Sequence, residues 1–177
     1  IYSATSSNLG NNGKDENSSP YSWCKSKNIE LIKNYSKWFG LRYELLFFYN
    51  VYGQGQISVG KMATIIGIFE DQYKNKKTLT VVKPGTQKRD FTHIDDIVEG
   101  CYLAMQKGKQ SEYMFCSGTK YSIIQIVKMF SVKYKFISQR AGDRSDSITL
   151  NNNAKKILGF TPKRNIRTYI KDFIANN

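Results

Sequence analysis

The chain has 177 residues, 40% of them hydrophobic, which is enough for one domain with a buried core. No apolar run is long enough to cross a membrane, and no basic segment followed by an apolar one indicates a signal peptide. The single histidine, His93, excludes a histidine-based metal cluster, and we expect no metal site. The three cysteines have no metal-type spacing, so we expect reduced thiols in a cytoplasmic protein.

The net charge is +13 at neutral pH. Such a charge suits attraction to a polyanion or to a phosphate-bearing substrate. The lysines are scattered along the chain rather than gathered in one run, however, which favours a lysine-heavy surface as the explanation. Because no aromatic–basic patch or nucleic-acid motif is present, nucleic acid is not an expected partner, and a basic nucleic-acid-binding module is the remote alternative.

Apolar periodicity and turn residues predict strands that alternate with helices. The expected strands are 1–4, 43–49, 78–82, 91–93, 112–116 and 135–137. The expected helices are 21–39, 61–73, one that Asp95 or Asp96 begins and that runs to 107, 123–132, and two short ones that close the chain. Asp96 is expected to cap its helix rather than to touch a ligand. The alternation predicts an α/β fold.

Tyr21 and Lys25 are four residues apart, which places both side chains on one face of a helix. An ammonium beside a phenol favours the phenolate, and such a phenol can take a proton from a sugar hydroxyl. Tyr73 and Lys77 have the same spacing, but they read as a solvated helix end. The first pair differs in its context, because Pro20 marks a helix start directly before Tyr21.

Six short motifs occur in a fixed order along nearly the whole chain. They resemble those of the NAD-dependent sugar-nucleotide epimerase/dehydratase family, the extended short-chain dehydrogenases, and within it those of UDP-hexose 4-epimerases. The motifs are YSATSSNLG, SPYSWCK, FFYNVYG, LTVVKPGTQKRDFTHIDD, FCSG and RAGD. The resemblance implies a Rossmann-like doubly wound fold with a small α/β substrate domain, NAD as cofactor and a UDP-sugar as substrate.

The glycine-rich fingerprint that binds the dinucleotide pyrophosphate is absent from this sequence. By resemblance, we therefore expect the later part of a longer enzyme, which is inactive by itself. Residues 1–55 would be the late part of the dinucleotide-binding domain. Residues 56–177 would be mainly the substrate domain, with some segments that return to the Rossmann sheet. Family enzymes commonly dimerise through the helix that carries Tyr21, so we expect a homodimer of the full-length enzyme.

The resemblance assigns catalytic roles to Thr5, Tyr21 and Lys25. Tyr21 would be the acid or base at the sugar 4-hydroxyl, and Lys25 would lower the pKa of Tyr21 and hold the nicotinamide ribose. Thr5 would bridge the sugar hydroxyl and Tyr21; a hydroxyl that only bonds the backbone is the alternative. Family dehydratases carry Asp and Glu directly after this threonine, whereas Ser6 and Ser7 stand here. This difference favours epimerisation over dehydration, and Ser6 joins the expected substrate contacts.

Further contacts follow from the motif FFYNVYG. Asn50 matches an asparagine that binds the substrate beside its diphosphate, for which an amide has the required donor. Phe48 matches an aromatic residue near the nicotinamide, with core packing as the alternative. The family usually has arginine where Phe47 stands. Met62 falls near the loop that lines the substrate.

Three positive or acidic positions match the phosphate and ribose contacts of the family. Arg89 matches a diphosphate-binding arginine, whose fork suits a phosphate. Arg140 and Asp143 match the pair that holds the second phosphate and the nucleotide ribose. Ser147 stands at the gate of the hexose pocket, where a small residue is associated with N-acetylated sugars.

The sequence therefore predicts part of a UDP-hexose 4-epimerase, in which C4 is transiently oxidised by bound NAD. UDP-N-acetylhexosamine is a second substrate class. Heptose or GDP-sugar epimerases and decarboxylases of the same fold remain alternatives, because the sequence assigns no contact to the nucleotide base.

Overall fold

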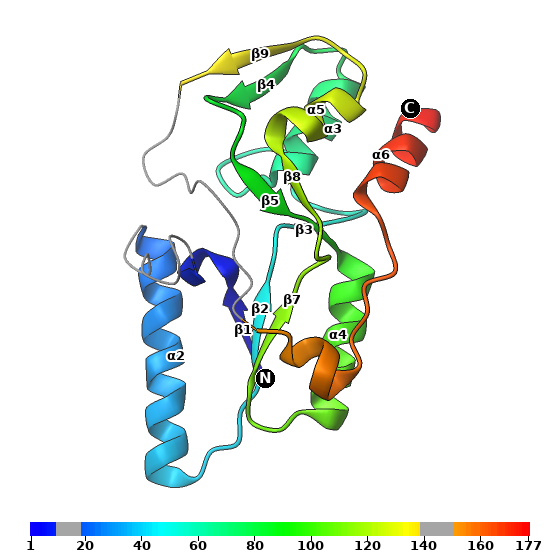
Figure 1. Ribbon diagram of the computed structural model, residues 1–177. Helices are drawn as coiled ribbons and strands as arrows, with labels where there is room; N and C mark the ends of the chain where they lie inside the picture. The colour runs from blue at the N-terminus through cyan, green and yellow to red at the C-terminus, as the bar shows by residue number, and fades with distance from the viewer. Residues whose placement is uncertain (10–18, 139–150) are drawn as a thin grey trace.

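The computed structural model describes residues 1–9, 19–138 and 151–177. Its first part is built on a sheet of three parallel strands in the order β1-β2-β7 (Figure 1). Thr5 lies beside Phe48, and Phe48 beside Phe115, so the three strands end at one edge of the sheet. The strands are β1 (Tyr2–Thr5), β2 (Leu45–Phe48) and β7 (Glu112–Phe115).

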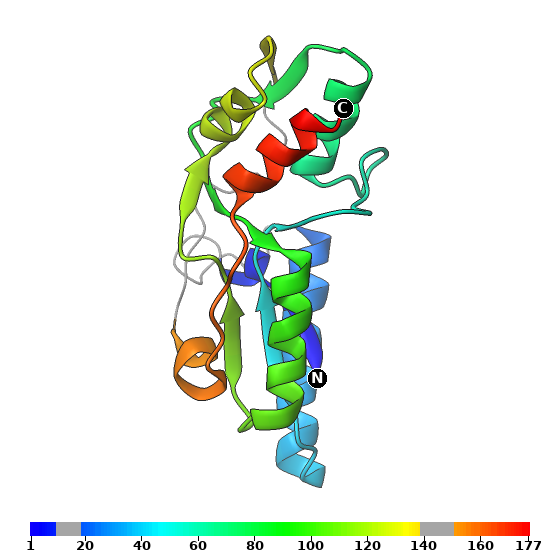
Figure 2. The ribbon, with the colours of Figure 1, turned by 90° about the vertical axis from the view of Figure 1, so that its right-hand side faces the viewer.

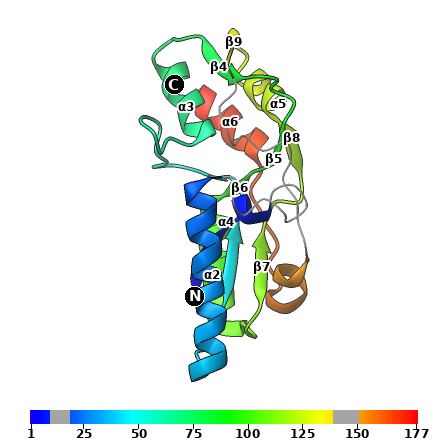
Figure 3. The same ribbon diagram turned by 90° about the vertical axis from the view of Figure 1, so that its left-hand side faces the viewer.

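The central strand β2 is covered on both faces, as its unbroken apolar run predicts. Leu45 and Phe47 belong to the core on the side of α2 (Pro20–Phe39), and Leu46 belongs to the core on the side of α4 (Ile94–Lys107). The two helices lie on opposite faces, α4 nearer the viewer in Figure 2 and α2 in Figure 3. Each buried side chain of this size contributes roughly 1.5–3 kcal/mol to folding.

The second part lies at the carboxyl edge of this sheet. It contains two small sheets, of which β4–β9 is parallel and β5–β8 antiparallel. A separate aromatic and aliphatic core joins them to three helices, with Phe69, Phe130 and Ile170 fully or nearly fully buried. The elements are α3 (Ile65–Lys74), β4 (Leu79–Val82), β5 (Lys88–Asp90), β8 (Lys120–Ser122), α5 (Ile123–Met129), β9 (Tyr134–Ile137) and α6 (Ile166–Ala175).

Two short helical elements and one strand pair complete the described chain. η1 (Ser6–Leu9) follows β1, and η2 (Ala154–Leu158) packs on α4 and β7. Between the two parts, β3 (Val51–Tyr52) pairs in parallel with β6 (Thr92–His93). β7, although it lies far along the sequence, pairs with β2 in the first sheet. Among the described residues, no helix has the length and apolar character needed to cross a membrane.

The α/β class and the order of the long elements agree with the sequence prediction. α2 begins as predicted, because the Ser19 side chain accepts the Ser22 N–H and Pro20 is the first residue, and it ends at Gly40 in the left-handed region. The predicted start of the second helix at residue 61 is wrong: Thr64 is the cap, and its hydroxyl accepts the Gly67 N–H at 3.1 Å.

The prediction that Asp96 caps its helix is also wrong. His93 is the cap residue of α4, and its Nδ1 accepts the Asp95 N–H at 3.2 Å. The strand predicted at 91–93 is confirmed only at β6, which covers Thr92–His93, and the predicted helix at 123–132 ends at Met129. β3, β5 and β8, each two or three residues long, were not predicted.

Candidate active site

A hollow of about 380 Å³ lies where β1 and β2 end. Ligands of open parallel sheets bind at this edge, because the strand ends and the following loops leave a crevice there. Three elements bring the predicted catalytic and cofactor-binding residues together: Thr5 ends β1, Tyr21 and Lys25 lie in the first turns of α2, and Phe48 ends β2. All four residues line the hollow, together with Ser6.

The α2 helix is tied to β1 through Lys25. Its Nζ donates to the Ser3 carbonyl oxygen at 2.8 Å and lies 5.0 Å from the centroid of the Tyr2 ring. Tyr21, one turn earlier, is 53% exposed, so its phenol is open to a ligand. The ammonium is therefore held at the wall of the hollow, while the phenol stays accessible to a substrate hydroxyl.

Thr5 is nearly buried at the end of β1, and its hydroxyl oxygen accepts the Ser7 N–H at 3.1 Å. This backbone contact is the alternative that the sequence left open. This contact occupies one lone pair of the Thr5 hydroxyl oxygen, so the hydroxyl proton can still be donated toward the hollow. Phe48 is half-buried and stacks on Phe115, with ring centroids 6.2 Å apart.

A second hollow, of about 540 Å³, lies between α3, β4 and β5. Its walls are largely apolar, with Ile66, Phe69 and Ile123 among them, and Arg89 supplies a cation from β5. Arg89 is only 8% exposed, and its Nη1 donates to the Lys88 carbonyl oxygen at 2.9 Å. A guanidinium in such surroundings favours an anionic group, because fewer waters screen its charge.

Asn50 lines both hollows and joins them. Its Nδ2 donates to the Asp90 carbonyl oxygen at 2.8 Å, which fixes the side chain against β5. One amide N–H remains for a ligand, since each amide has two. The predicted residues Tyr21 and Arg89 thus belong to two adjoining hollows that Asn50 connects.

Asp90 is a residue that the sequence prediction missed. Its carboxylate is 2% exposed and accepts the N–H groups of Ser117 and Gly118 at 2.7 and 2.8 Å. Burial raises the pKa of this carboxyl, and the two backbone N–H groups oppose that rise. Asp90 positions Asn50 through its carbonyl oxygen. The sequence offered one indication of Asp90, which is its position directly after the predicted phosphate-binding residue Arg89.

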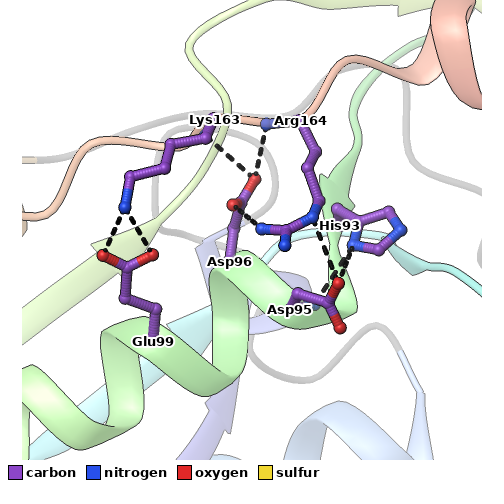
Figure 4. Close-up of polar contacts among 6 residues, drawn as sticks. All are labelled: His93, Asp95, Asp96, Glu99, Lys163 and Arg164. Atoms are coloured by element: carbon purple, nitrogen blue, oxygen red, sulfur yellow. Dashed lines mark hydrogen bonds and ion pairs between the residues drawn. The ribbon is translucent and has the colours of Figure 1, made fainter.

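Asp96 fastens the segment before α6 to α4 (Figure 4). Its carboxylate, 1% exposed, accepts the N–H groups of Lys163 and Arg164 and the Arg164 Nη1 at 3.2, 3.1 and 3.0 Å. Glu99 pairs with Lys163 on the surface, where such a pair adds little stability. Asp96 lines neither hollow, so its role is to hold the two parts of the fold together.

The other predicted positions divide into two groups. Met62 is 74% exposed and lines neither hollow, so the structure does not bring it to the candidate site. Arg140, Asp143 and Ser147 lie outside the described residues. No group of histidine, cysteine and acidic side chains suited to a metal ion occurs in residues 1–9, 19–138 and 151–177.

The residues around the first hollow fit the nicotinamide end of NAD. A phenol, an ammonium and an aromatic face converge at the carboxyl edge of a parallel sheet, where this group of cofactors binds. The fit concerns that end only, since the residues around the hollow include no glycine-rich turn for a pyrophosphate.

This fold and this site are typical of α/β proteins that bind a nicotinamide dinucleotide. The family model described as "NAD dependent epimerase/dehydratase family" matches residues 2–116, and the chain belongs to this family. The UDP-glucose 4-epimerase of Bacillus subtilis (strain 168) is 31% identical over 127 residues, which are 66% of this chain and 35% of the relative. A putative UDP-glucose 4-epimerase of Methanocaldococcus jannaschii is 26% identical over 90% of this chain and 54% of its own length.

Solved structures agree on the fold. The UDP-glucose 4-epimerase of Thermotoga maritima, crystallised with UDP-glucose, matches 88% of this chain and 52% of its own with a TM-score of 0.82 at 26% identity. A dTDP-glucose 4,6-dehydratase of Streptomyces venezuelae shares the fold at 18% identity, with a TM-score of 0.85. The chain spans about a third to three fifths of the curated relatives named here and of these structures.

Proposed function

We propose that this chain is the catalytic and substrate-binding part of a nucleotide-sugar 4-epimerase that acts on a UDP-hexose with NAD. One observation carries the proposal: the hollow with Thr5, Tyr21 and Lys25 adjoins, at Asn50, a larger hollow with a nearly buried arginine. A sugar diphosphate has the matching order of groups, a hydroxylated ring next to two phosphates. The epimerases among the relatives support this substrate class.

The chemistry follows from the groups in the first hollow. Tyr21 removes the proton of the sugar 4-hydroxyl and returns it after the sugar has turned its other face to the phenol. Thr5 donates its hydroxyl proton along the same path, and Lys25 holds the nicotinamide ribose, as the family resemblance implies. NAD, when bound, supplies the hydride acceptor and donor for C4.

Two serines distinguish this reaction from dehydration. Ser6, the first residue of η1 directly after β1, is 4% exposed and lines the hollow, and Ser7 lines it as well. Elimination of water needs an additional acid and base beside the sugar, and the serine hydroxyl groups do not supply them at neutral pH. The site chemistry therefore favours epimerisation, although the fold is shared with dehydratases and the relatives include UDP-glucuronic acid decarboxylases.

We also propose that Arg89 and Asn50 bind the diphosphate, that Arg140 and Asp143 bind the second phosphate and the ribose, and that Ser147 admits N-acetylated sugars. The division at residues 55 and 56 would separate the cofactor side from the substrate side. Dimerisation through α2 has support from its exposed apolar side chains, which include Trp23, Leu31, Tyr35 and Trp38. A cytoplasmic location agrees with the three cysteines, all in the described part, none of which forms a disulfide.

Isothermal titration with UDP, UDP-glucose, UDP-N-acetylglucosamine and GDP-mannose, with and without NAD, tests the proposal. We expect UDP-sugars to bind and Arg89→Ala to weaken them, with GDP-mannose clearly weaker. The ratio of the two UDP-sugar affinities tests the role of Ser147. If a folded chain binds none of them, a polypeptide extended upstream through a glycine-rich fingerprint is titrated next. Failure of that longer protein to bind or epimerise a UDP-sugar contradicts the proposal.

A further inference from the structure

We propose that the chain has a second anion site, separate from the two hollows of the candidate active site, that binds a small ligand with two or more phosphate groups. The site is a hollow of about 400 Å³ at the end of α3, lined by Lys74, Lys76, Lys77 and Lys133 together with Thr78. It shares no lining residue with the hollows at Tyr21 and Arg89, so the inference does not depend on the proposed epimerase function.

Two neighbouring turns gather the lysines. Lys76 and Lys77 lie in the turn that leads from α3 to β4, and Lys133 lies in the turn that leads from α5 to β9. The two turns are held side by side because the Leu79 N–H donates to the Lys133 carbonyl oxygen at 3.0 Å and β4 pairs with β9. Side chains that are 56 residues apart in the sequence therefore line one hollow.

The lysines are not explained by the helix end alone. A lysine in the last turn of a helix stabilises it through the helix dipole, and Lys74 is in that position. Lys76 and Lys77, however, come after the helix, and their N–H groups already complete the turn by donating to the Tyr73 and Gln72 carbonyl oxygens. Their ammonium groups are therefore additional charges at this place.

The positive charge of the hollow is offset only in part, because Glu70 interacts electrostatically with Lys74, and Asn177, the last residue of the sequence, also lines the hollow. No aspartate or glutamate lines it, and no ion pair is formed by the four lysines within the described part of the chain. Lys74 lies with its Nζ 5.2 Å from the centroid of the Phe173 ring, which keeps its charge at this end of the molecule. Four ammonium groups around one hollow repel one another, and a bound polyvalent anion relieves that repulsion.

The shape of the site favours a small ligand over a long polyanion or a membrane. A volume of about 400 Å³ is in the range of small-molecule pockets, whereas a duplex or a lipid surface needs an extended or flat basic face. Lysine acts on phosphates as a point charge, and several lysines suit a group of two or three phosphates better than a single one. Thr78 adds a hydroxyl that can donate to a phosphate oxygen.

Titration of the chain with inorganic pyrophosphate and tripolyphosphate, followed by calorimetry and by backbone amide NMR, tests this site. The variant Lys76→Gln/Lys77→Gln/Lys133→Gln keeps a polar side chain at each position and removes three charges. The matched control Lys107→Gln/Lys109→Gln/Lys155→Gln removes three exposed charges that do not line the hollow. We expect the first variant to lose about tenfold or more in affinity and the control to lose less than about twofold.

The amide signals separate this site from the Arg89 hollow. We expect the Thr78 and Lys133 amides to shift in the wild-type chain and in the control. Equal losses in both variants would mean that net charge alone binds the anion, and would overturn the proposal. The same conclusion follows if only Arg89 and Asn50 shift, or if duplex DNA binds in a Lys133-dependent way while pyrophosphate does not. A comparison of ADP with pyrophosphate tells whether a nucleotide or an inorganic phosphate is the better source of the group.

Discussion

The hollow beside Tyr21 and the hollow beside Arg89 meet at Asn50 but are built differently. The first is formed by the ends of β1 and β2 and the start of α2. It carries hydroxyl, phenol and ammonium groups that a substrate can reach from solvent. The second has apolar walls from α3 and α5 around a nearly buried guanidinium. In the proposed function the first hollow would transfer protons, which needs accessible groups, and the second would bind an anion, which gains from burial, so the two tasks would be separated in space.

The largest expected effect comes from breaking the first hollow. In an active protein that contains this chain, Tyr21→Phe should lower kcat about 10²–10⁴-fold and leave the KM for the UDP-sugar within about twofold, because only the proton-transfer group is lost. Steady-state assays of epimerisation measure both constants. Tyr73→Phe is the matched control, since Tyr73 precedes Lys77 by the same four residues and lines neither hollow. A similar loss in both variants would argue against the role of Tyr21.

Breaking the second hollow should have the opposite pattern. Arg89→Ala should weaken UDP binding about 10–100-fold, because charge-assisted hydrogen bonds to a phosphate are worth roughly 1.5–3 kcal/mol. Arg89→Lys keeps the charge but loses the fork, and should fall between Arg89→Ala and the wild type. Calorimetry measures the affinities, and circular dichroism checks the fold of each variant. Arg42→Ala, an exposed arginine outside both hollows, should bind normally; unchanged binding by Arg89→Ala would refute this assignment.

Asn50→Ala tests the connection between the hollows. Because Asn50 lines both, its loss should raise KM and lower kcat together, each by about 2–10-fold, the worth of one ordinary hydrogen bond. The same kinetic assay separates this result from the one-sided effects of Tyr21→Phe and Arg89→Ala. A change in only one constant would mean that the two hollows work independently.

The smallest expected effect is on stability and leaves both hollows intact. Burial is the main cause that lowers the pKa of His93, with Arg164 acting in the same direction and Asp95 and Asp96 opposing it. The unfolded chain therefore binds the proton first, at about pH 6.5, and the stability due to neutral His93 is present above that pH and is lost as the pH falls below it. Urea unfolding at several pH values should show this loss.

His93→Asn keeps a side chain that caps helices but does not titrate. As the pH falls from 7.5 toward 5, the unfolding free energy of the wild type should therefore decrease more than that of this variant. Buried carboxyls such as Asp90 titrate in both proteins and cancel in the difference. A difference that does not change with pH would contradict the role of His93.

Much of the fold was predictable because its signals are local. The apolar run of β2, the cap at Ser19 and the glycine after α2 each act within a few residues. The errors arose where a tertiary contact decided the outcome. Asp96 has the sequence of a helix cap, but its carboxylate instead binds the backbone of Lys163 and Arg164, more than sixty residues later.

The candidate site divides in the same way. The resemblance of short motifs pointed to Tyr21, Lys25, Thr5, Asn50 and Arg89, and the structure brings all five to two adjoining hollows. It also pointed to Met62, whose side chain is exposed, since the residues around it form no helix and α3 begins only at Ile65. Asp90 was missed because its importance rests on the distant Ser117 and Gly118 N–H groups.

The sequence by itself determined the α/β class, the helix that presents Tyr21 and Lys25 on one face, and the family whose motifs the chain carries, because all of these depend on short-range periodicity and spacing. Only the tertiary structure decided that Asn50 lines two hollows and that Lys133 lies beside Lys76 and Lys77. It also decided that the buried carboxylates of Asp90 and Asp96 bind backbone N–H groups of distant segments. The physical reason is that strand pairing and helix packing bring together residues whose separation along the chain carries no sign of their contact.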